Sequence, residues 1–205
     1  MTRYDVGGSE GQHEPGSAEE VLKNRLGITS VPEMNELELM LLQQLYEQVL
    51  LQELPPGPVT VAMLREWHRR WLGNVYDWAG QDRGVNMSKG GFAFAAAAQI
   101  PRLLTLFERD ILARFTPCTA MQGDALVEAI ATVHVEFILI HPFREGNGRL
   151  SRLLADVMAV QAGEEPLDYS SWDANKPAYL AAIHAGMSGD YQPMMRWVAK
   201  ALGEA

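Results

Sequence analysis

A base, an acid, a glycine turn and two arginines fall within the twelve residues 141–152, HPFREGNGRLSR. Pro142 disfavours helical geometry at the residue before it, so we expect the preceding helix to stop at His141 and to leave the imidazole at the mouth of a turn. A histidine near its ordinary pKa can take a proton from an attacking hydroxyl group at neutral pH. His141 is therefore the candidate catalytic base.

The turn Gly146-Asn147-Gly148 is the candidate anion site. Its glycines let the backbone turn sharply and point successive N–H groups into a concavity. The helix expected to begin here adds the positive end of its macrodipole. Arg149 and Arg152 are neighbours on the first turn of that helix. Two guanidinium groups facing one anion site indicate a di- or triphosphate, because each can engage phosphate oxygens in a bidentate manner.

Glu145 is the candidate ligand of a Mg²⁺ ion that the phosphates would share, and one carboxylate is enough because Mg²⁺ keeps most of its waters. Phe143 is expected to be buried as the anchor of the loop. A Ser, Thr or Tyr hydroxyl could then attack phosphorus with His141 as the base, while the metal, the N–H groups and the guanidinium groups stabilise charge. Taken singly these residues are common structural features, and the hypothesis depends on their co-occurrence.

Helices must carry this loop, and apolar residues at spacings of three and four predict them on both sides. A first helix is expected from Asn35, whose side chain would cap it, to the proline-rich break at 54–58. A second begins at Thr60, whose hydroxyl can accept from exposed N–H groups. Further helices are expected over 100–111, over 126–140, over 150–157, and after Asn175 and Asp190.

The helical period disappears between residues 80 and 94, and the hairpin is expected over 84–94. Short alternation around the Gly90-Gly91 pair suits a turn that needs positive φ, so a small β-hairpin is expected here. Its exposed strand edge could pair with an extended segment of another protein through main-chain hydrogen bonds. A hairpin that only closes a loop is the alternative. The expected fold class is all-α with one hairpin.

Composition bounds the partners and the compartment. The chain of 205 residues has a net charge of -9, which repels nucleic acid and anionic membranes, so neither is an expected partner. Cys118 is the only cysteine, which suits a reducing compartment and indicates a cytoplasmic protein. Residues 1–21, rich in Gly, Ser, Glu and Pro, are expected to form an irregular arm before one folded domain over 22–205.

The segment 141–152 resembles the signature HPFx(D/E)GNGRxxR of the Fic family of protein adenylyltransferases, and every specified position matches. YDWAGQDR (76–83) and MSKGGF (87–92) resemble the segment that leads into the family's target-docking flap, and KNRLGI (23–28) resembles its N-terminal lead-in. The likeness covers most of the chain from about residue 22. It implies a Fic-type helical bundle that transfers AMP from ATP–Mg²⁺ to a hydroxyl of a target protein, with release of pyrophosphate.

The resemblance also implies which residues carry each role. In it, His141 deprotonates the target hydroxyl and Glu145 holds Mg²⁺. The residues that it implies in nucleotide binding are Gly146, Asn147, Gly148, Arg149, Arg152 and, for the adenine, Tyr179. Trp172 and Trp197 lie in the same region, where aromatic residues are more often core. The residues that it implies in target docking are Ser88, Lys89, Gly90, Gly91 and Phe92.

Many Fic proteins carry an inhibitory motif, (S/T)xxx(E/D)(G/N), whose glutamate pairs with the second signature arginine. The nearest match here, TSVPEM (29–34), ends in Met and contains a proline. The chain therefore resembles the Fic class restrained by a small antitoxin protein, whose glutamate would pair with Arg152. Other relatives transfer phosphate or phosphocholine, or remove AMP. Gly148 favours AMP transfer because the phosphate-moving branch has a bulkier residue there. A non-catalytic nucleotide-binding module and a helical scaffold remain further alternatives.

Overall fold

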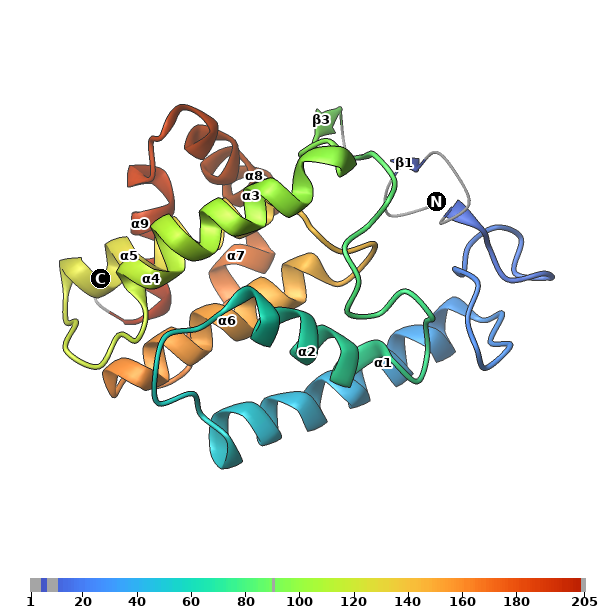
Figure 1. The fold of residues 1–205 in the computed structure, drawn as a ribbon, viewed down its shortest axis with the longest axis horizontal. Helices are drawn as coiled ribbons and strands as arrows, with labels where there is room; N and C mark the ends of the chain where they lie inside the picture. The colour runs from blue at the N-terminus through green and yellow to red at the C-terminus, as the bar shows by residue number, and fades with distance from the viewer. Residues whose placement is uncertain (1–4, 7–10, 90, 204–205) are drawn as a thin grey trace.

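The structure is a computed structural model that describes residues 5–6, 11–89 and 91–203. It is mostly helical with a small antiparallel sheet, as the sequence predicted (Figure 1). The strands are β1 (Asp5–Val6), β2 (Met87–Lys89) and β3 (Phe92–Ala93). The helices are α1 (Val31–Tyr46), η2 (Glu47–Gln52), α2 (Val61–Leu72), η3 (Ala97–Gln99), α3 (Ile100–Leu106), η4 (Phe107–Leu112), α4 (Ala113–Phe115), α5 (Asp124–Ile140), α6 (Asn147–Ala162), α7 (Ser170–Ala174), α8 (Lys176–Ala185), η5 (Gly186–Ser188) and α9 (Gln192–Ala201).

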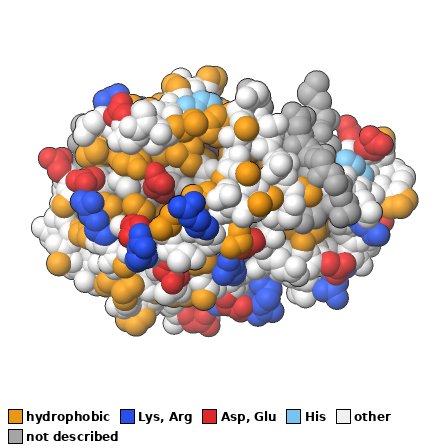
Figure 2. Space-filling view, turned by 45° about the horizontal axis from the view of Figure 1, so that its top comes forward, with side chains coloured by type: hydrophobic (Ala, Val, Ile, Leu, Met, Phe, Trp, Pro, Cys, Tyr) orange, Lys and Arg blue, Asp and Glu red, His pale blue; other side chains and the backbone are white. Residues whose placement is uncertain are grey.

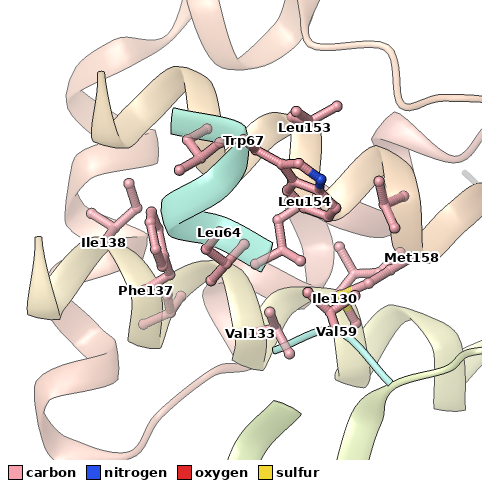
Figure 3. Packing of buried hydrophobic residues seen from close by; sticks show 14 of the residues in the cluster. Val59, Leu64, Trp67, Ile130, Val133, Phe137, Ile138, Leu153, Leu154 and Met158 are labelled. Atoms are coloured by element: carbon pink, nitrogen blue, oxygen red, sulfur yellow. The ribbon is translucent and has the colours of Figure 1, made fainter. Parts of the chain in front are cut away.

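Helices α5 and α6 form the centre of the molecule. Residues of α5 are buried on nearly all sides, as expected for a helix whose sequence is apolar all round. Helix α2 packs on α6, with α1 against α2, whereas α3, α8 and α9 pack on α5 (Figure 1). Leu64 of α2, Phe137 of α5 and Leu154 of α6 belong to one buried apolar cluster (Figure 3). The loop between α5 and α6 is therefore held by the two best-packed helices.

The beginning of α1 differs from the sequence expectation. The cap is Ser30, whose hydroxyl accepts from the backbone N–H of Glu33 at 3.5 Å, and the helix starts at Val31 rather than at Asn35. Pro32 is compatible with this start because the first turn of a helix leaves its N–H groups without intrahelical partners. The expected cap of α2 is confirmed, since the Thr60 hydroxyl accepts from the N–H of Met63 at 3.2 Å.

The expected hairpin is present, and its edge is partly covered. Strands β2 and β3 pair antiparallel, with Lys89 opposite Phe92 and a positive φ of 81° at Gly91. Gly90 lies outside the described residues. Strand β1 pairs antiparallel with the other edge of β2, so β3 is the hairpin strand that stands at an edge of the described sheet. The pairing of β1 with β2 joins segments about 80 residues apart in sequence, which hairpin periodicity does not reveal.

The N-terminal segment was expected to be irregular. Of its described residues, Asp5 and Val6 form β1, and most of residues 11–21 lie in turns and bends, with an isolated bridge between His13 and Leu22. The division of the chain into an arm over 1–21 and a domain over 22–205 stays a prediction. Among the described residues, no helix is both long and apolar enough to cross a membrane.

Candidate functional site

The loop 141–146 joins α5 to α6 through two left-handed backbone conformations. Helix α5 ends at Ile140 with His141 as its C-cap, so it stops where Pro142 predicts. His141 has φ 51° and ψ 59°, a region that residues other than glycine seldom adopt. Gly146 caps α6 with φ 84°. A Cβ at Gly146 would lie 2.6 Å from an atom of the Trp71 ring, so this turn requires glycine for its conformation and for its close packing.

Side chains from inside and outside the loop fix its shape. The Asn147 amide accepts from the N–H of Phe143 at 2.9 Å and donates to its carbonyl at 2.7 Å. Phe143 is buried, as expected, and stacks on His68 with 4.0 Å between ring centroids. His68 accepts from the N–H of Gly80 through Nδ1, so Nε2–H donates to the Glu145 carbonyl. The Asn147 side chain thus closes the loop.

His141 is buried, not exposed at the mouth of a turn as the sequence suggested. His141 is only 3% exposed, and its ring stacks on Phe94, the residue after β3, with 3.7 Å between ring centroids. Burial lowers the pKa of His141 to about 3, so the expectation of an ordinary pKa is also wrong. Nδ1 lies 3.2 Å from the Ile138 carbonyl, which accepts its proton and leaves the lone pair on Nε2.

Both signature arginines are engaged by carboxylates of the same chain. Arg149 donates to Glu38 of α1 at 2.7 Å and to Glu145 at 3.4 Å. Arg152 makes a bidentate pair with Asp173 of α7, at 2.6 and 3.2 Å, and these bonds hold the pKa of Asp173 below its usual value. Glu38 and Asp173 were not identified from the sequence, because nothing local to either residue marks it as a partner of this loop.

A cavity of about 480 Å³ brings most of the predicted residues together. Its walls come from the hairpin, the loop 141–146, the first turn of α6, and α7 with α8. The predicted site residues that line it are His141, Glu145, Gly146, Gly148, Arg149, Arg152, Tyr179, Lys89 and Phe92. A Cβ at Gly148 would meet no atom within 4 Å, so a larger residue there would stand in open space. Of the other predictions, Asn147, Ser88 and Gly91 are not part of the lining.

The far end of the cavity is aromatic. Tyr179 stacks on Trp172 with 5.1 Å between centroids, and its hydroxyl lies 2.8 Å from Nε2 of His134. Burial lowers the pKa of His134 to about 3, so this imidazole is neutral and accepts the hydroxyl proton of Tyr179. Trp197 contributes only a backbone carbonyl, which accepts from the Trp172 indole at 3.2 Å. The sequence offered His134 only as one polar residue in an apolar helix.

Charged side chains form neither a patch of one sign on the face in Figure 2 nor a metal-binding cluster among the described residues. On the face shown in Figure 2, Lys and Arg side chains are interspersed with Asp and Glu rather than gathered in one patch. Within the described ranges, no group of three or more His, Cys, Asp or Glu residues is placed to hold a metal ion. Glu145 is the acidic residue of the loop that lines the cavity, so an ion here would need ligands from a bound phosphate as well.

Comparisons with known proteins agree on the family. The model of the Fic/DOC family matches residues 58–159. The probable protein adenylyltransferase y4lH of Sinorhizobium fredii is 31% identical over 174 residues, which cover 85% of this chain and 87% of that protein. The probable protein adenylyltransferase Fic of Escherichia coli K12 is 29% identical, over 91% of this chain and 90% of that protein.

Solved structures share the fold at lower identity. The N-terminal Fic domain of a Bartonella effector protein superposes with a TM-score of 0.76 at 22% identity, over 92% of this chain and 89% of that one. The BepC protein of Bartonella tribocorum, solved with bound AMPPNP, gives a TM-score of 0.73 at 22% identity, over 92% of this chain and 94% of that one. With its signature loop, its helical bundle and these relatives, the chain belongs to the Fic/DOC family.

Proposed function

We propose that this chain transfers AMP from ATP–Mg²⁺ to a Ser, Thr or Tyr hydroxyl of a target protein. The observation that carries the proposal is one cavity lined by His141, by Glu145, by the N-terminal turn of α6 and by two arginines. A base, an anion site and guanidinium groups in one enclosure are what nucleotidyl transfer requires. Relatives named as probable protein adenylyltransferases support the same reaction.

His141 acts as the base in this proposal. Because its Nδ1–H donates to the Ile138 carbonyl, the Nε2 lone pair is available to take the proton of the attacking hydroxyl. The hydroxyl oxygen forms a bond to the α-phosphorus, and the bond from that phosphorus to the β-phosphate oxygen breaks. Pyrophosphate leaves with the electron pair. Burial lowers the pKa of His141, so the imidazole is neutral at physiological pH.

The start of α6 binds the phosphates. Its first N–H groups, including those of Asn147 and Gly148, have no intrahelical acceptors and lie at the positive end of the helix. Arg149 and Arg152 hold the outer phosphates after exchanging part of their bonding from carboxylates to phosphate oxygens. Tyr179 contributes to the adenine pocket, with Trp172 stacked behind it.

Glu145 fits Mg²⁺ as a single protein ligand. It lines the cavity beside the anion site, and Mg²⁺ commonly takes one or two carboxylates together with phosphate oxygens and waters. A bound Mg²⁺ would neutralise charge on the phosphates during transfer. The Glu145 carboxylate also accepts from the N–H of Gly146 at 3.0 Å, and this bond orients it toward the turn.

The hairpin is the proposed docking site of the target. Lys89 and Phe92 line the same cavity as His141, and Ser88 and Gly91 belong to the same hairpin. Main-chain pairing with a strand edge would present an extended target segment, with its hydroxyl, to the cavity. Gly90, at the turn, belongs to this proposal on sequence alone.

Regulation by an antitoxin stays part of the proposal. A small partner protein would bring a glutamate to Arg152, whose side chain is 27% exposed and already donates to the Asp173 carboxylate. Capture of the chain from its own host, followed by mass spectrometry, should yield one small partner protein. If the purified chain is fully active, and an extract of that host does not change its activity, regulation by an antitoxin is contradicted. The cytoplasmic location likewise rests on composition.

Radiolabelled ATP distinguishes the proposed reaction from its alternatives. A bacterial lysate is incubated with Mg²⁺ and the wild-type protein or His141→Ala, using ATP labelled with ³²P at either the α or the γ position. AMP transfer predicts labelled protein from α-labelled ATP only, and only with the wild type. Label from γ-labelled ATP would indicate phosphotransfer, and loss of label from a previously modified protein would indicate AMP removal. ATP binding without any transfer would indicate a regulatory module.

A further inference from the structure

Arg83 is a buried cation between the hairpin and the catalytic loop. It lies in the segment between α2 and β2, and it is only 3% exposed. A buried guanidinium group is costly unless hydrogen bonds compensate for the lost water. The partners of Arg83 are therefore informative about what this residue does.

The guanidinium group bonds to the hairpin on one side. It donates through Nη1 to the Val85 carbonyl at 2.5 Å and through Nη2 to the Ala95 carbonyl at 2.6 Å. Val85 precedes β2 and Ala95 follows β3, so the two carbonyls belong to the two ends of the hairpin. A single side chain thus holds both ends of the hairpin together.

On its other side the same group bonds to the end of α5. Nε donates to the His141 carbonyl at 2.7 Å, and Nη2 lies 3.4 Å from the Ile140 carbonyl. The backbone N–H of Arg83 donates to the Pro142 carbonyl at 2.8 Å. Terminal carbonyls of a helix have no intrahelical donors, and a cation complements the negative end of the helix dipole.

Arg83 bonds to His141, a residue with an unfavourable backbone conformation. The backbone of His141 is in the left-handed region, with a φ of 51°, which is unfavourable for a residue other than glycine. Such a conformation persists only where surrounding contacts determine it. The Arg83 bonds to the carbonyls of His141 and Pro142 are contacts of this kind.

We propose that Arg83 is a positioning residue. It fixes the position of the hairpin relative to the His141 backbone, so that a hydroxyl held at the hairpin meets the imidazole. The inference rests on the proposed function for its catalytic meaning. Only the fork of a guanidinium group can reach these carbonyls on two sides at once; the ammonium group of lysine is a single point with a shorter reach.

The variant Arg83→Lys tests the proposal, with Arg70→Lys as the matched control. Arg70 also donates through two nitrogens, to Glu53 at 2.7 Å and Gln48 at 2.6 Å, but it lies on α2 with partners outside the hairpin. In Arg83→Lys, hydrogen exchange should accelerate in residues 84–95 and 138–143 together, while the affinity for ATP stays within about twofold of wild type. Faster exchange in only one of the two segments would overturn the proposal.

Transfer of label provides the functional readout. With α-³²P-ATP at saturation and the lysate acceptor as probe, Arg83→Lys should lose about tenfold or more of the transfer rate, because small misplacement of reacting groups is costly. Arg70→Lys should transfer like the wild type. Coupled exchange with no loss of transfer would overturn the positioning role. Absence of transfer in the wild type would instead contradict the proposed function and leave the exchange result to be judged separately.

Native-state hydrogen exchange on the wild type covers the case in which Arg83→Lys does not fold. The N–H of Ala95 donates to the Leu139 carbonyl at 3.3 Å, and that of Arg83 donates to Pro142. If one structural unit contains both segments, these two amides should share one opening free energy as denaturant is raised. Opening of Ala95 at a clearly lower free energy than Arg83 would refute the coupling.

Discussion

Arg152 and Asp173 form the residue pair with the most direct consequence for nucleotide binding. Both line the cavity, and their bidentate contact occupies the donors that an outer phosphate would use. The side chains are 27% and 65% exposed, so water screens the pair and its net strength is about 0.5–1 kcal/mol. In the proposed function an outer phosphate of ATP replaces this contact, so we expect Asp173 to lower the affinity for a triphosphate.

The variant Asp173→Asn should bind ATP about two- to fivefold more tightly, because the competing carboxylate is removed. AMP, which lacks the outer phosphates, should gain little. Isothermal titration of the two nucleotides measures both effects. Asp110→Asn is the matched control, since Asp110 makes a similar bidentate pair with Arg109 and is not part of the cavity lining. Weaker ATP binding by Asp173→Asn would show that Asp173 instead positions Arg152.

For individual residues, the sequence predicted which neighbours in the chain share the site, but not which residues far apart in sequence contact it. The base, acid, glycine turn and arginines occupy twelve consecutive residues, so their proximity follows from the chain itself. The partner of Arg149 is Glu38, 111 residues away, and that of Arg152 is Asp173, 21 residues away. The burial of His141 depends on Phe94, which approaches through the tertiary fold. Such contacts are not encoded in any local pattern.

At the scale of elements, the junction of α5 and α6 depends on Gly146. Ala at this position meets two penalties, a φ of 84° and a Cβ 2.6 Å from the Trp71 ring. We expect Gly146→Ala to reduce the free energy of unfolding by about 2–4 kcal/mol and to weaken ATP binding. Urea denaturation and nucleotide titration measure the two effects.

Gly163→Ala, at the other end of α6, separates backbone strain from steric overlap. Gly163 ends α6 with a φ of 89°, and a Cβ there would meet no atom within 4 Å. It therefore carries the strain alone, and we expect its substitution to cost about 1 kcal/mol. Equal costs for Gly146→Ala and Gly163→Ala would contradict the role assigned to Trp71.

Helices and the hairpin were predictable as elements because their signals are local. Apolar spacing identified α2, α5 and α6, and the Gly90-Gly91 pair identified the hairpin. The start of α1 was missed because Asn35 and Ser30 are both good capping residues, and packing of Met34 in the core favours the earlier start. The pairing of β1 with β2 was missed because two residues carry no strand pattern of their own.

At the scale of the whole molecule, buried histidines make stability depend on pH. Burial lowers the pKa of His68 to about 4 and those of His134 and His141 to about 3, whereas each titrates near 6.5 in the unfolded chain. Below pH 6.5 the unfolded state binds more protons, so stability falls as pH decreases. Burial raises the pKa of Asp156 to about 6, which acts in the opposite direction because the folded state takes up that proton first.

The expected net loss of stability between pH 7.5 and 5.5 is about 3 kcal/mol, from three histidines partly offset by one carboxyl group. Urea denaturation at the two pH values measures it as a lower midpoint at pH 5.5. In His68→Gln the dependence on pH should be shallower by about one proton. An unchanged or higher midpoint at pH 5.5 in the wild type would contradict the assigned burial.

In the proposed reaction His141 moves the proton while other residues hold the nucleotide. The rate of AMP transfer to protein from α-³²P-ATP tests this division of roles in wild type and His141→Ala, each at an ATP concentration that saturates it by titration. We expect ATP affinities within about threefold of each other and a loss of about 10²–10⁴ in the transfer rate of His141→Ala. Transfer by His141→Ala at the wild-type rate and equal ATP occupancy would contradict the account.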